Sequence, residues 1–185
     1  MTKNNKKENT LNFKPKPRIK TQILAEIAIF TALGTALSLI TVFRLPNGGS
    51  ITMGAMVPML WLALRRGPKI GITIGIIYGL VQLATIPKIY YPTQALLDYP
   101  LAFGCLGLAG LFKNHPIPGV TVAILGRLIM HLISGAIFFA QYAPVGMNPW
   151  VYSTLYNGSY MLPELAISII VIYLLYRSNV LRAYM

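Results

Sequence analysis

Residues 94–110 read Gln94-Ala-Leu-Leu-Asp-Tyr-Pro-Leu-Ala-Phe-Gly-Cys-Leu-Gly-Leu-Ala-Gly110, an apolar stretch of membrane-crossing length with one carboxylate inside it. That carboxylate, Asp98, is the only acidic residue between Glu26 and Glu164. An ionisable side chain in such a segment is energetically expensive, so by default it marks a site that handles ions, protons or polar solutes. Asp98 is therefore the first candidate functional residue.

The composition places this stretch in a membrane protein. The chain has 185 residues, of which 55% are hydrophobic and only 11% are charged, whereas soluble domains carry about 25% charged residues. The mean hydropathy is +0.60. No polar insert is long enough to form a second domain, so we expect one compact bundle. The single cysteine, Cys105, cannot form an internal disulfide.

Six apolar runs follow one another, separated by Pro, Gly and basic residues that are typical of loops. They cover Thr21–Phe43, Ile51–Leu64, Lys69–Ile86, Thr93–Phe112, Gly119–Gln141 and Val151–Tyr176. The second run is short for a hydrocarbon core of about 30 Å. Pro100 and Pro163 should kink the fourth and the sixth. The predicted fold class is an all-α integral membrane protein, a six-transmembrane-helix bundle.

The positions of the basic residues predict its orientation. With six crossings both termini share a side, which collects seven cations of the first twenty residues together with Arg65, Arg66, Lys69, Lys113, Arg177 and Arg182. The other side has only Arg44 and Lys88. Cytoplasmic loops carry the excess of Lys and Arg, so both termini are predicted to be cytoplasmic. The net charge of +12 is thus explained by basic residues that set the orientation in the membrane and contact anionic lipid. It does not indicate nucleic-acid binding.

The predicted domain organisation follows from these spans. Residues 1–20 form a disordered basic cytoplasmic tail, because they are rich in Asn and Lys and contain two prolines. Residues 21–177 form the six-helix membrane substrate-binding domain, and residues 178–185 form a short cytoplasmic C-terminal tail.

Small residues recur at helical spacing and predict where helices approach closely. The two glycine sets, on the third and fourth spans, favour tight internal packing. They are Gly71, Gly75 and Gly79, and Gly104, Gly107 and Gly110. A ridge containing Ala28 and Ala32 on the first span could equally pack inside the protein or face a partner.

Polar residues on the last three spans predict a pocket. Arg127, His131 and Gly135 are spaced by four and so lie on one helical face. The sixth span likewise aligns Asn157 with Tyr160 and Glu164. A membrane interior tolerates such groups when they face one another or a wet cavity. We expect a polar pocket with aromatic walls, of the kind that binds small molecules.

A purely structural reading of the same residues stays open. Asp98 and Arg127 could form a buried ion pair, and His131 could be a core histidine with its hydrogen bonds satisfied. A ring of Tyr, Asn and His beside one structural pair favours the pocket.

Enzyme chemistry finds little support in the sequence. Two His and one Cys do not have the spacing of a metal site, and there is no phosphate-binding Gly-rich loop that ends in Lys and Ser or Thr. We therefore expect no enzyme activity, no metal and no cofactor. A small binding bundle that is energised by other subunits fits better than a gradient-driven transporter with inverted repeats.

Several segments together resemble the ThiT family, the thiamine-specific S-components of energy-coupling factor (ECF) vitamin transporters. The resemblance covers roughly residues 22–176. It is carried by Leu45-Pro-Asn-Gly-Gly-Ser-Ile51, Leu64-Arg-Arg-Gly67, Gln94-Ala-Leu-Leu-Asp-Tyr99, Gly126-Arg127 with His131 and Ser134-Gly135, Gln141-Tyr-Ala143, and Tyr152-Ser with Tyr156-Asn-Gly158.

The resemblance implies a six-helix subunit of the prokaryotic cell membrane that captures thiamine from outside. It also implies docking on a transmembrane coupling subunit driven by two ATPase subunits. The family's ligand-contacting pattern falls on Asp98, Tyr99, Arg127, His131, Gly135, Phe139, Tyr152 and Asn157. The small-residue ridge that meets the coupling subunit falls on Ala28 and Ala32. The family often has Glu at the position of Asp98, Lys at that of Arg127 and Trp at that of Phe139.

The residue types suit that ligand. Thiamine presents a cationic thiazolium, an aminopyrimidine and a hydroxyethyl arm. Aromatic side chains such as Phe139 and Tyr152 can stabilise the cation, and a carboxylate at Asp98 can accept from the exocyclic amine. Arg127 is expected to steer and neutralise Asp98. Two other readings remain: an S-component for a different vitamin or precursor, and a structural membrane subunit that binds no small molecule.

Overall fold

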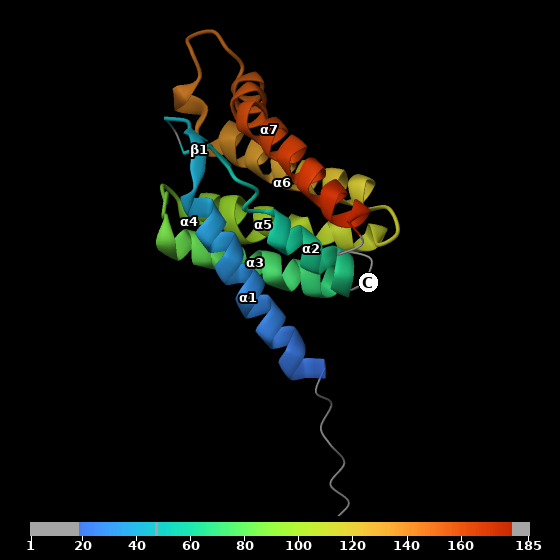
Figure 1. The fold of residues 1–185 in the computed structure, drawn as a ribbon. Helices are drawn as coiled ribbons and strands as arrows, with labels where there is room; N and C mark the ends of the chain where they lie inside the picture. The colour runs from blue at the N-terminus through green and yellow to red at the C-terminus, as the bar shows by residue number, and fades with distance from the viewer. Residues whose placement is uncertain (1–18, 47, 179–185) are drawn as a thin grey trace, which may run out of the picture.

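The computed structural model describes residues 19–46 and 48–178, which form a bundle of helices capped at one end by a short hairpin (Figure 1). Most of the two predicted tails, residues 1–18 and 179–185, lies outside the described residues; Ile19 and Lys20, which were assigned to the N-terminal tail, belong to helix α1. In chain order the elements are α1 (Ile19–Leu39), β1 (Thr41–Arg44), β2 (Ser50–Thr52), α2 (Val57–Arg66), α3 (Pro68–Thr85), α4 (Pro92–Leu96), η1 (Leu97–Leu101), α5 (Ala102–Gly104), η2 (Cys105–Phe112), α6 (Pro116–Phe138), η3 (Ala140–Tyr142) and α7 (Pro149–Arg177).

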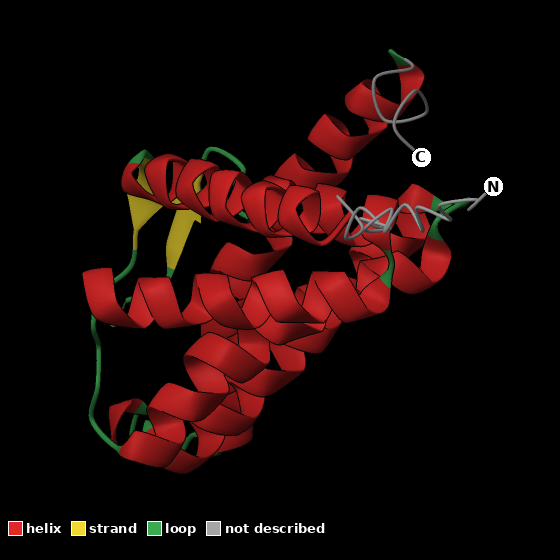
Figure 2. Ribbon diagram, turned by 90° about the horizontal axis from the view of Figure 1, so that it is seen from below, coloured by secondary structure: helices red, strands yellow, loops and turns green. Residues whose placement is uncertain are grey.

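Five helical stretches among the described residues are long and apolar enough to cross a membrane. They are Lys20–Leu39, Pro68–Thr85, Pro92–Phe112, Pro116–Phe138 and Pro149–Arg177. These correspond to the first and to the third to sixth predicted spans, so the prediction of a mostly helical, multi-pass membrane protein is confirmed. Figure 2 shows how these long helices run beside one another with the hairpin at one end.

The prediction of one helical span over Ile51–Leu64 is wrong, because this stretch contains a strand, a turn and a short helix. Its first residues belong to strand β2 and a turn, and Gly54 in that turn has φ +83°, which few side chains tolerate. Helix α2 begins only at Val57 and has 10 residues. At 1.5 Å per residue it extends about 15 Å, about half of a membrane core.

The hairpin was not expected in an all-α protein. Strands β1 and β2 are antiparallel, with Thr41 opposite Thr52 and Arg44 opposite Ser50. The first predicted span, Thr21–Phe43, therefore ends as helix at Leu39 and continues as strand. The hairpin connects α1 to α2 and covers one end of the bundle (Figure 1).

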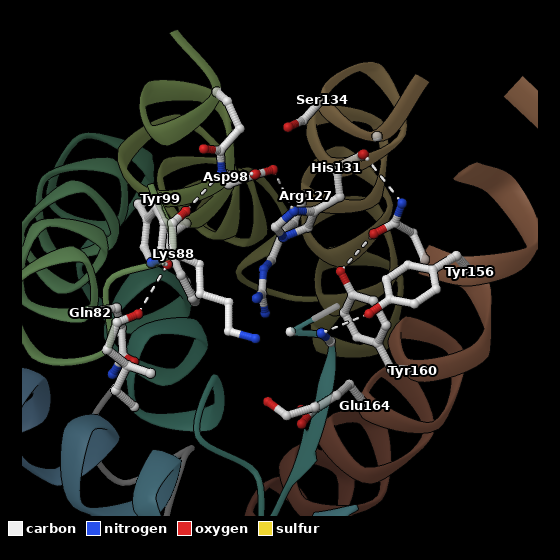
Figure 3. Close-up of a pocket in the computed structure, with 18 of the residues that line it drawn as sticks. Gln82, Lys88, Asp98, Tyr99, Arg127, His131, Ser134, Tyr156, Tyr160 and Glu164 are labelled. Atoms are coloured by element: carbon white, nitrogen blue, oxygen red, sulfur yellow. Dashed lines mark hydrogen bonds and ion pairs between the residues drawn. The ribbon is translucent and has the colours of Figure 1, made fainter. Parts of the chain in front are cut away.

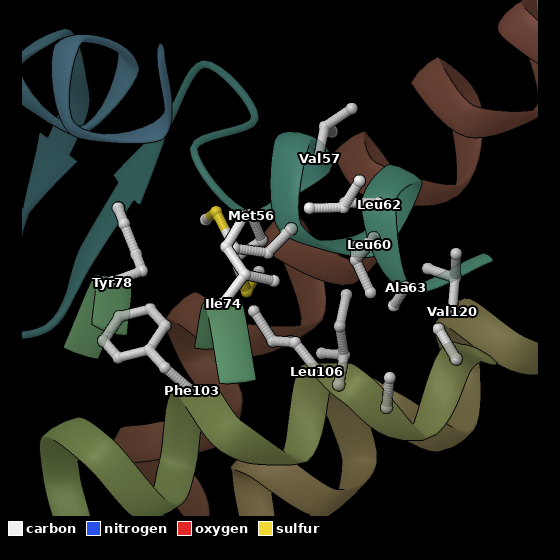
Figure 4. Packing of buried hydrophobic residues seen from close by; sticks show 14 of the residues in the cluster. Met56, Val57, Leu60, Leu62, Ala63, Ile74, Tyr78, Phe103, Leu106 and Val120 are labelled. Atoms are coloured by element: carbon white, nitrogen blue, oxygen red, sulfur yellow. The ribbon is translucent and has the colours of Figure 1, made fainter. Parts of the chain in front are cut away.

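Helix α2 lies at the centre of the packing. Its residues Leu60, Leu62 and Leu64 are fully buried, and they belong to the same apolar cluster as Ile74 of α3 and Leu106 of η2 (Figure 4). An ion pair holds the end of α2 to α1, because Arg66 donates to both carboxylate oxygens of Glu26 at 2.8 and 2.6 Å. The Glu26 carboxylate thereby raises the pKa of the Arg66 guanidinium above its ordinary value.

The glycines pack α3 against the fourth span, as predicted. A side chain at Gly79 would meet the backbone of Tyr99, and one at Gly75 would meet that of Phe103. One at Gly107 would meet the backbone of α3 in turn. Close backbone approach of this kind replaces the hydrophobic effect as a source of helix association in lipid.

The fourth span is helical throughout but irregular. Its middle, η1, is a π-helical turn that contains Pro100, and its last part, η2, is a 3₁₀ helix. Proline has no N–H for the usual helical hydrogen bond, and a π turn accommodates that loss. This turn presents Asp98 and Tyr99. Helix α7, in contrast, continues through Pro163.

Candidate functional site

A cavity of about 210 Å³ lies between the hairpin and the helices. The pocket was predicted between the last three spans, but its lining also comes from α1, the hairpin, the residues before α2, and α3 with the loop that follows it. All eight residues predicted to bind the ligand line this one cavity: Asp98, Tyr99, Arg127, His131, Gly135, Phe139, Tyr152 and Asn157. Figure 3 shows the polar members of the lining pointing toward the same space.

Asp98 is held by two partners. Gln94 Nε2 donates to its Oδ2 at 2.6 Å, and Nδ1 of His131 lies 3.0 Å from its Oδ1 (Figure 3). Gln94 precedes Asp98 by four residues and so lies on the same face of the fourth span. The side chains of Asp98 and His131 are only 16% and 11% exposed. The carboxylate is therefore oriented by neighbours that leave it capacity to accept further hydrogen bonds.

The same stretch fixes the loop after α3. Gln94 also accepts from the backbone N–H of Tyr90 and donates to the carbonyl of Lys88. The Tyr99 hydroxyl donates to the carbonyl of Ile86 at 3.1 Å and accepts from the N–H of Lys88 at 3.0 Å. Tyr99 thus works as an anchor of the cavity wall, and the loop it holds brings the Lys88 side chain into the lining.

Arg127 does not pair with Asp98, contrary to the expectation that it neutralises that carboxylate. Its guanidinium lies over the Phe103 ring, 4.1 Å from the centroid, and Nη1 contacts Met56 Sδ at 2.7 Å. Within residues 19–46 and 48–178 it forms no ion pair. The reason is the order along α6: His131, one turn further on, occupies the position beside Asp98, and Arg127 extends toward α5 and the turn before α2.

Gly135 makes room where α6 crosses α7. A side chain there would meet Ser153 Oγ and, at 3.1 Å, Nδ2 of Asn157. Asn157 donates from Nδ2 to the carbonyls of His131 and Ser153, and its Oδ1 accepts from the Tyr160 hydroxyl at 2.7 Å. The donor and the acceptor of the Asn157 amide are therefore both engaged inside the protein.

Aromatic rings form part of the cavity wall. Phe139 packs edge-to-face against Tyr90, with centroids 5.3 Å apart. Tyr152 stacks on Tyr156 at 5.9 Å, and His131 lies edge-on to Tyr160 at 6.3 Å. These rings offer faces and edges to a flat or cationic ligand.

Four buried polar atoms of the lining have no hydrogen-bond partner within the described part of the chain. They are Arg127 Nε, His131 Nε2, Ser134 Oγ and Glu164 Oε2. Buried polar groups are normally satisfied, so a cluster of exceptions around one cavity indicates a place for a polar ligand. Donors and acceptors are both present, and a ligand that carries both kinds of group fits this lining.

Sequence reasoning omitted several lining residues. Gln94 had a usable signal, since it precedes Asp98 by one helical turn. Arg44 and Lys88 were assigned only to the outer side of the membrane, yet both line the cavity. No sequence pattern indicated that Met56 lines the cavity, because its position depends on the turn between β2 and α2.

The two residues predicted for a partner interface lie elsewhere. Ala28 and Ala32 are exposed on α1 and line a shallow apolar groove between α1 and α3. This groove is a separate feature from the cavity.

Comparison with known proteins finds relatives that match most of this chain. A sequence model of the family described as thiamine transporter protein (Thia_YuaJ) matches residues 24–182. The thiamine transporter ThiT of Bacillus subtilis (strain 168) is 36% identical over 173 residues, which cover 83% of this chain and 89% of the relative. The ThiT protein of Lacticaseibacillus paracasei is 28% identical over 170 residues, with 81% and 84% covered.

A solved structure is also similar. The structure described as ThiT from Listeria monocytogenes superimposes with a TM-score of 0.79 at 27% sequence identity. The match covers 87% of this chain and 96% of that one.

Proposed function

This chain belongs to the thiamine transporter family, and from that premise we propose that it is the substrate-capture subunit (S-component) of an ECF-type transporter that imports thiamine. It binds thiamine in the cavity below the hairpin, from the extracellular side. The observation that carries the proposal is the convergence of all eight predicted binding residues on one cavity with unsatisfied polar atoms.

Each part of thiamine finds a suitable group in this lining. The aminopyrimidine donates to the Asp98 carboxylate, which His131 and Gln94 hold in place. The thiazolium cation lies against the aromatic rings of Phe139 and Tyr152, where each ring contributes about 2 kcal/mol when the cation is desolvated. The flat heterocycles and the polar groups at both ends of the ligand match an aromatic-walled cavity with separated polar clusters.

We infer six crossings with both termini in the cytoplasm. Helix α2 and the hairpin before it complete the second crossing, although α2 alone is too short to span the core. Two observations support this arrangement. Arg66 at the end of α2 pairs with Glu26 near the start of α1, and a side chain at Gly67 would lie 3.6 Å from Lys113 Nζ. The basic loops thus gather at one end, which the positive-inside rule assigns to the cytoplasm.

Energy for uptake comes from other subunits in this proposal. The exposed ridge of Ala28 and Ala32 docks on a transmembrane coupling subunit, and two ATPase subunits drive that subunit. Small residues let two helices approach closely in lipid, and the apolar groove between α1 and α3 can accept a partner helix. The protein then resides in the plasma membrane of a prokaryotic cell.

A thiamine titration of the detergent-purified protein tests the proposal. Intrinsic fluorescence of Trp61 and Trp150 reports binding, and calorimetry gives the stoichiometry. We expect saturable binding of one thiamine per chain at nanomolar concentration. A folded protein that binds a different vitamin or a pyrimidine precursor would change the substrate. One that binds none of them would favour a structural subunit.

A further inference from the structure

Glu164 is a second carboxylate of the cavity, and its two oxygens have different surroundings. It lies in the middle of α7 and is 3% exposed. Its Oε1 accepts from the backbone N–H of Thr52 and, at 2.7 Å, from the Thr52 hydroxyl. Its Oε2 is buried, has no partner among the described residues, and belongs to a side chain that lines the cavity.

The contact with Thr52 alone does not account for a carboxylate. That contact fastens β2 to α7 and uses one oxygen, for which an amide would serve as well. A buried acceptor without a donor costs free energy, and the cost is larger for a charged group. The second oxygen has no donor among the described residues, and the cavity is the place from which a ligand can supply one.

Glu164 and Asp98 lie on opposite sides of the cavity (Figure 3). Both oxygens of Asp98 already have protein partners, Gln94 and His131. Glu164 in contrast keeps one oxygen free. The cavity therefore presents acceptors at two separated places, and a ligand with donors at both of its ends matches it.

We propose that Glu164 Oε2 accepts the hydrogen bond of the alcohol at the end of thiamine's hydroxyethyl arm. The inference rests on the proposed function, because the ligand it names is the one proposed there. It assigns the amine end of the ligand to Asp98 and the alcohol end to Glu164. It makes Glu164 a residue that determines specificity, selecting ligands whose arm ends in a hydroxyl.

A matched ligand pair tests this assignment. The full chain, purified in detergent, is titrated with thiamine and with the analogue whose arm ends in a methyl group instead of the alcohol. A hydrogen bond to a charged group is strong enough that we expect thiamine to bind about tenfold more tightly. In Glu164→Gln the amide oxygen keeps the contacts with Thr52, and an NH₂ group replaces Oε2. A neutral hydrogen bond is about half as strong, so the ratio should fall to about threefold or less.

Two control variants separate this role from a structural one. Thr52→Val removes the hydroxyl that holds Oε1 but leaves Oε2 in place, and it should keep the ratio between the two ligands. Asp98→Asn should weaken both ligands equally and also keep the ratio, because it acts at the other end. If Glu164→Gln does not fold, equal affinity of the natural protein for the two ligands still overturns the assignment.

The outcomes are distinguishable. Equal affinity of the natural protein for thiamine and the methyl analogue would overturn the assignment of Glu164 and leave the proposed function intact. An unchanged tenfold ratio in folded Glu164→Gln would overturn it as well. A folded natural protein that binds neither ligand would overturn the proposed function, and the inference with it.

Discussion

Nδ1 of His131 lies 3.0 Å from Oδ1 of Asp98, so that a polar contact joins α6 to the π-helical turn η1. With a neutral imidazole, Nδ1–H donates to the carboxylate and Nε2 becomes an acceptor. That Nε2 is buried and has no partner in the described part of the chain. The contact therefore places a negative charge and a free acceptor side by side at the cavity wall.

Replacing Asp98 by Asn should weaken thiamine binding by at least tenfold. The amide keeps an oxygen for His131 but loses the charge that strengthens a hydrogen bond from the ligand amine. Calorimetry measures the affinity, and a thermal scan verifies that the variant is folded. Glu26→Gln is the matched control, because it changes a carboxylate outside the cavity and should leave the affinity unchanged. Equal affinity of Asp98→Asn and the natural protein would contradict the assignment.

Helical spacing was sufficient to predict much of the cavity. The four-residue steps on α6 and the three- and four-residue steps on α7 place side chains on one face whatever the rest of the fold does. It could not predict partners between helices. Asp98 was paired with Arg127, whereas the structure pairs it with His131. Arg127 and His131 are one helical turn apart on α6. The spacing of residues along each helix does not determine how far α6 is shifted along its axis relative to η1, so it could not decide between the two partners.

The hairpin escaped prediction for a different reason. Most residues of the two strands, 41–43 and 51–52, read as ends of membrane spans, and their strand conformation depends on groups elsewhere in the chain. Tyr156 accepts from the N–H of Gly49 at 3.1 Å, and Glu164 holds Thr52. Such contacts span more than one hundred residues of sequence, so no local pattern reports them.

The packing of glycines between α3 and the fourth span predicts that Gly107→Ala and Gly104→Ala differ in stability. A methyl group at Gly107 would meet the backbone of Ile72, which cannot move without separating the helices, whereas one at Gly104 would meet only the side chain of Ile76 at 3.3 Å. Overpacking costs about 1–3 kcal/mol, so Gly107→Ala should clearly lower the melting temperature in detergent. Gly104→Ala is the control and should change it little. Equal changes of the melting temperature in the two variants would show that the close approach of the backbones at Gly107 does not determine stability.

Gly135 predicts a coupled loss of stability and affinity. In Gly135→Ala the new methyl group would meet Ser153 and Asn157 and push α7 away from the cavity wall. We expect a lower melting temperature and weaker thiamine binding. Adding Ser153→Ala removes the nearest atom and should recover part of both. Gly158→Ala on α7 is the control, because its added methyl group would meet no neighbouring element within 4 Å among the described residues. If the double variant has the same melting temperature and thiamine affinity as Gly135→Ala, the contact with Ser153 is not the cause of the loss.

Ala28→Trp should separate binding from uptake. Ala28 is exposed on α1, outside the cavity, so a large side chain there leaves the thiamine site untouched. It fills the groove that the proposed coupling subunit would occupy. We therefore expect natural thiamine affinity in the purified variant, and loss of both thiamine uptake by cells and co-purification with the coupling subunit. Ile29→Trp is the matched control: Ile29 is 64% exposed on the neighbouring face of α1 and does not line the groove, so uptake should persist. Co-purification that survives Ala28→Trp would show that this ridge packs against lipid and that the partner docks elsewhere.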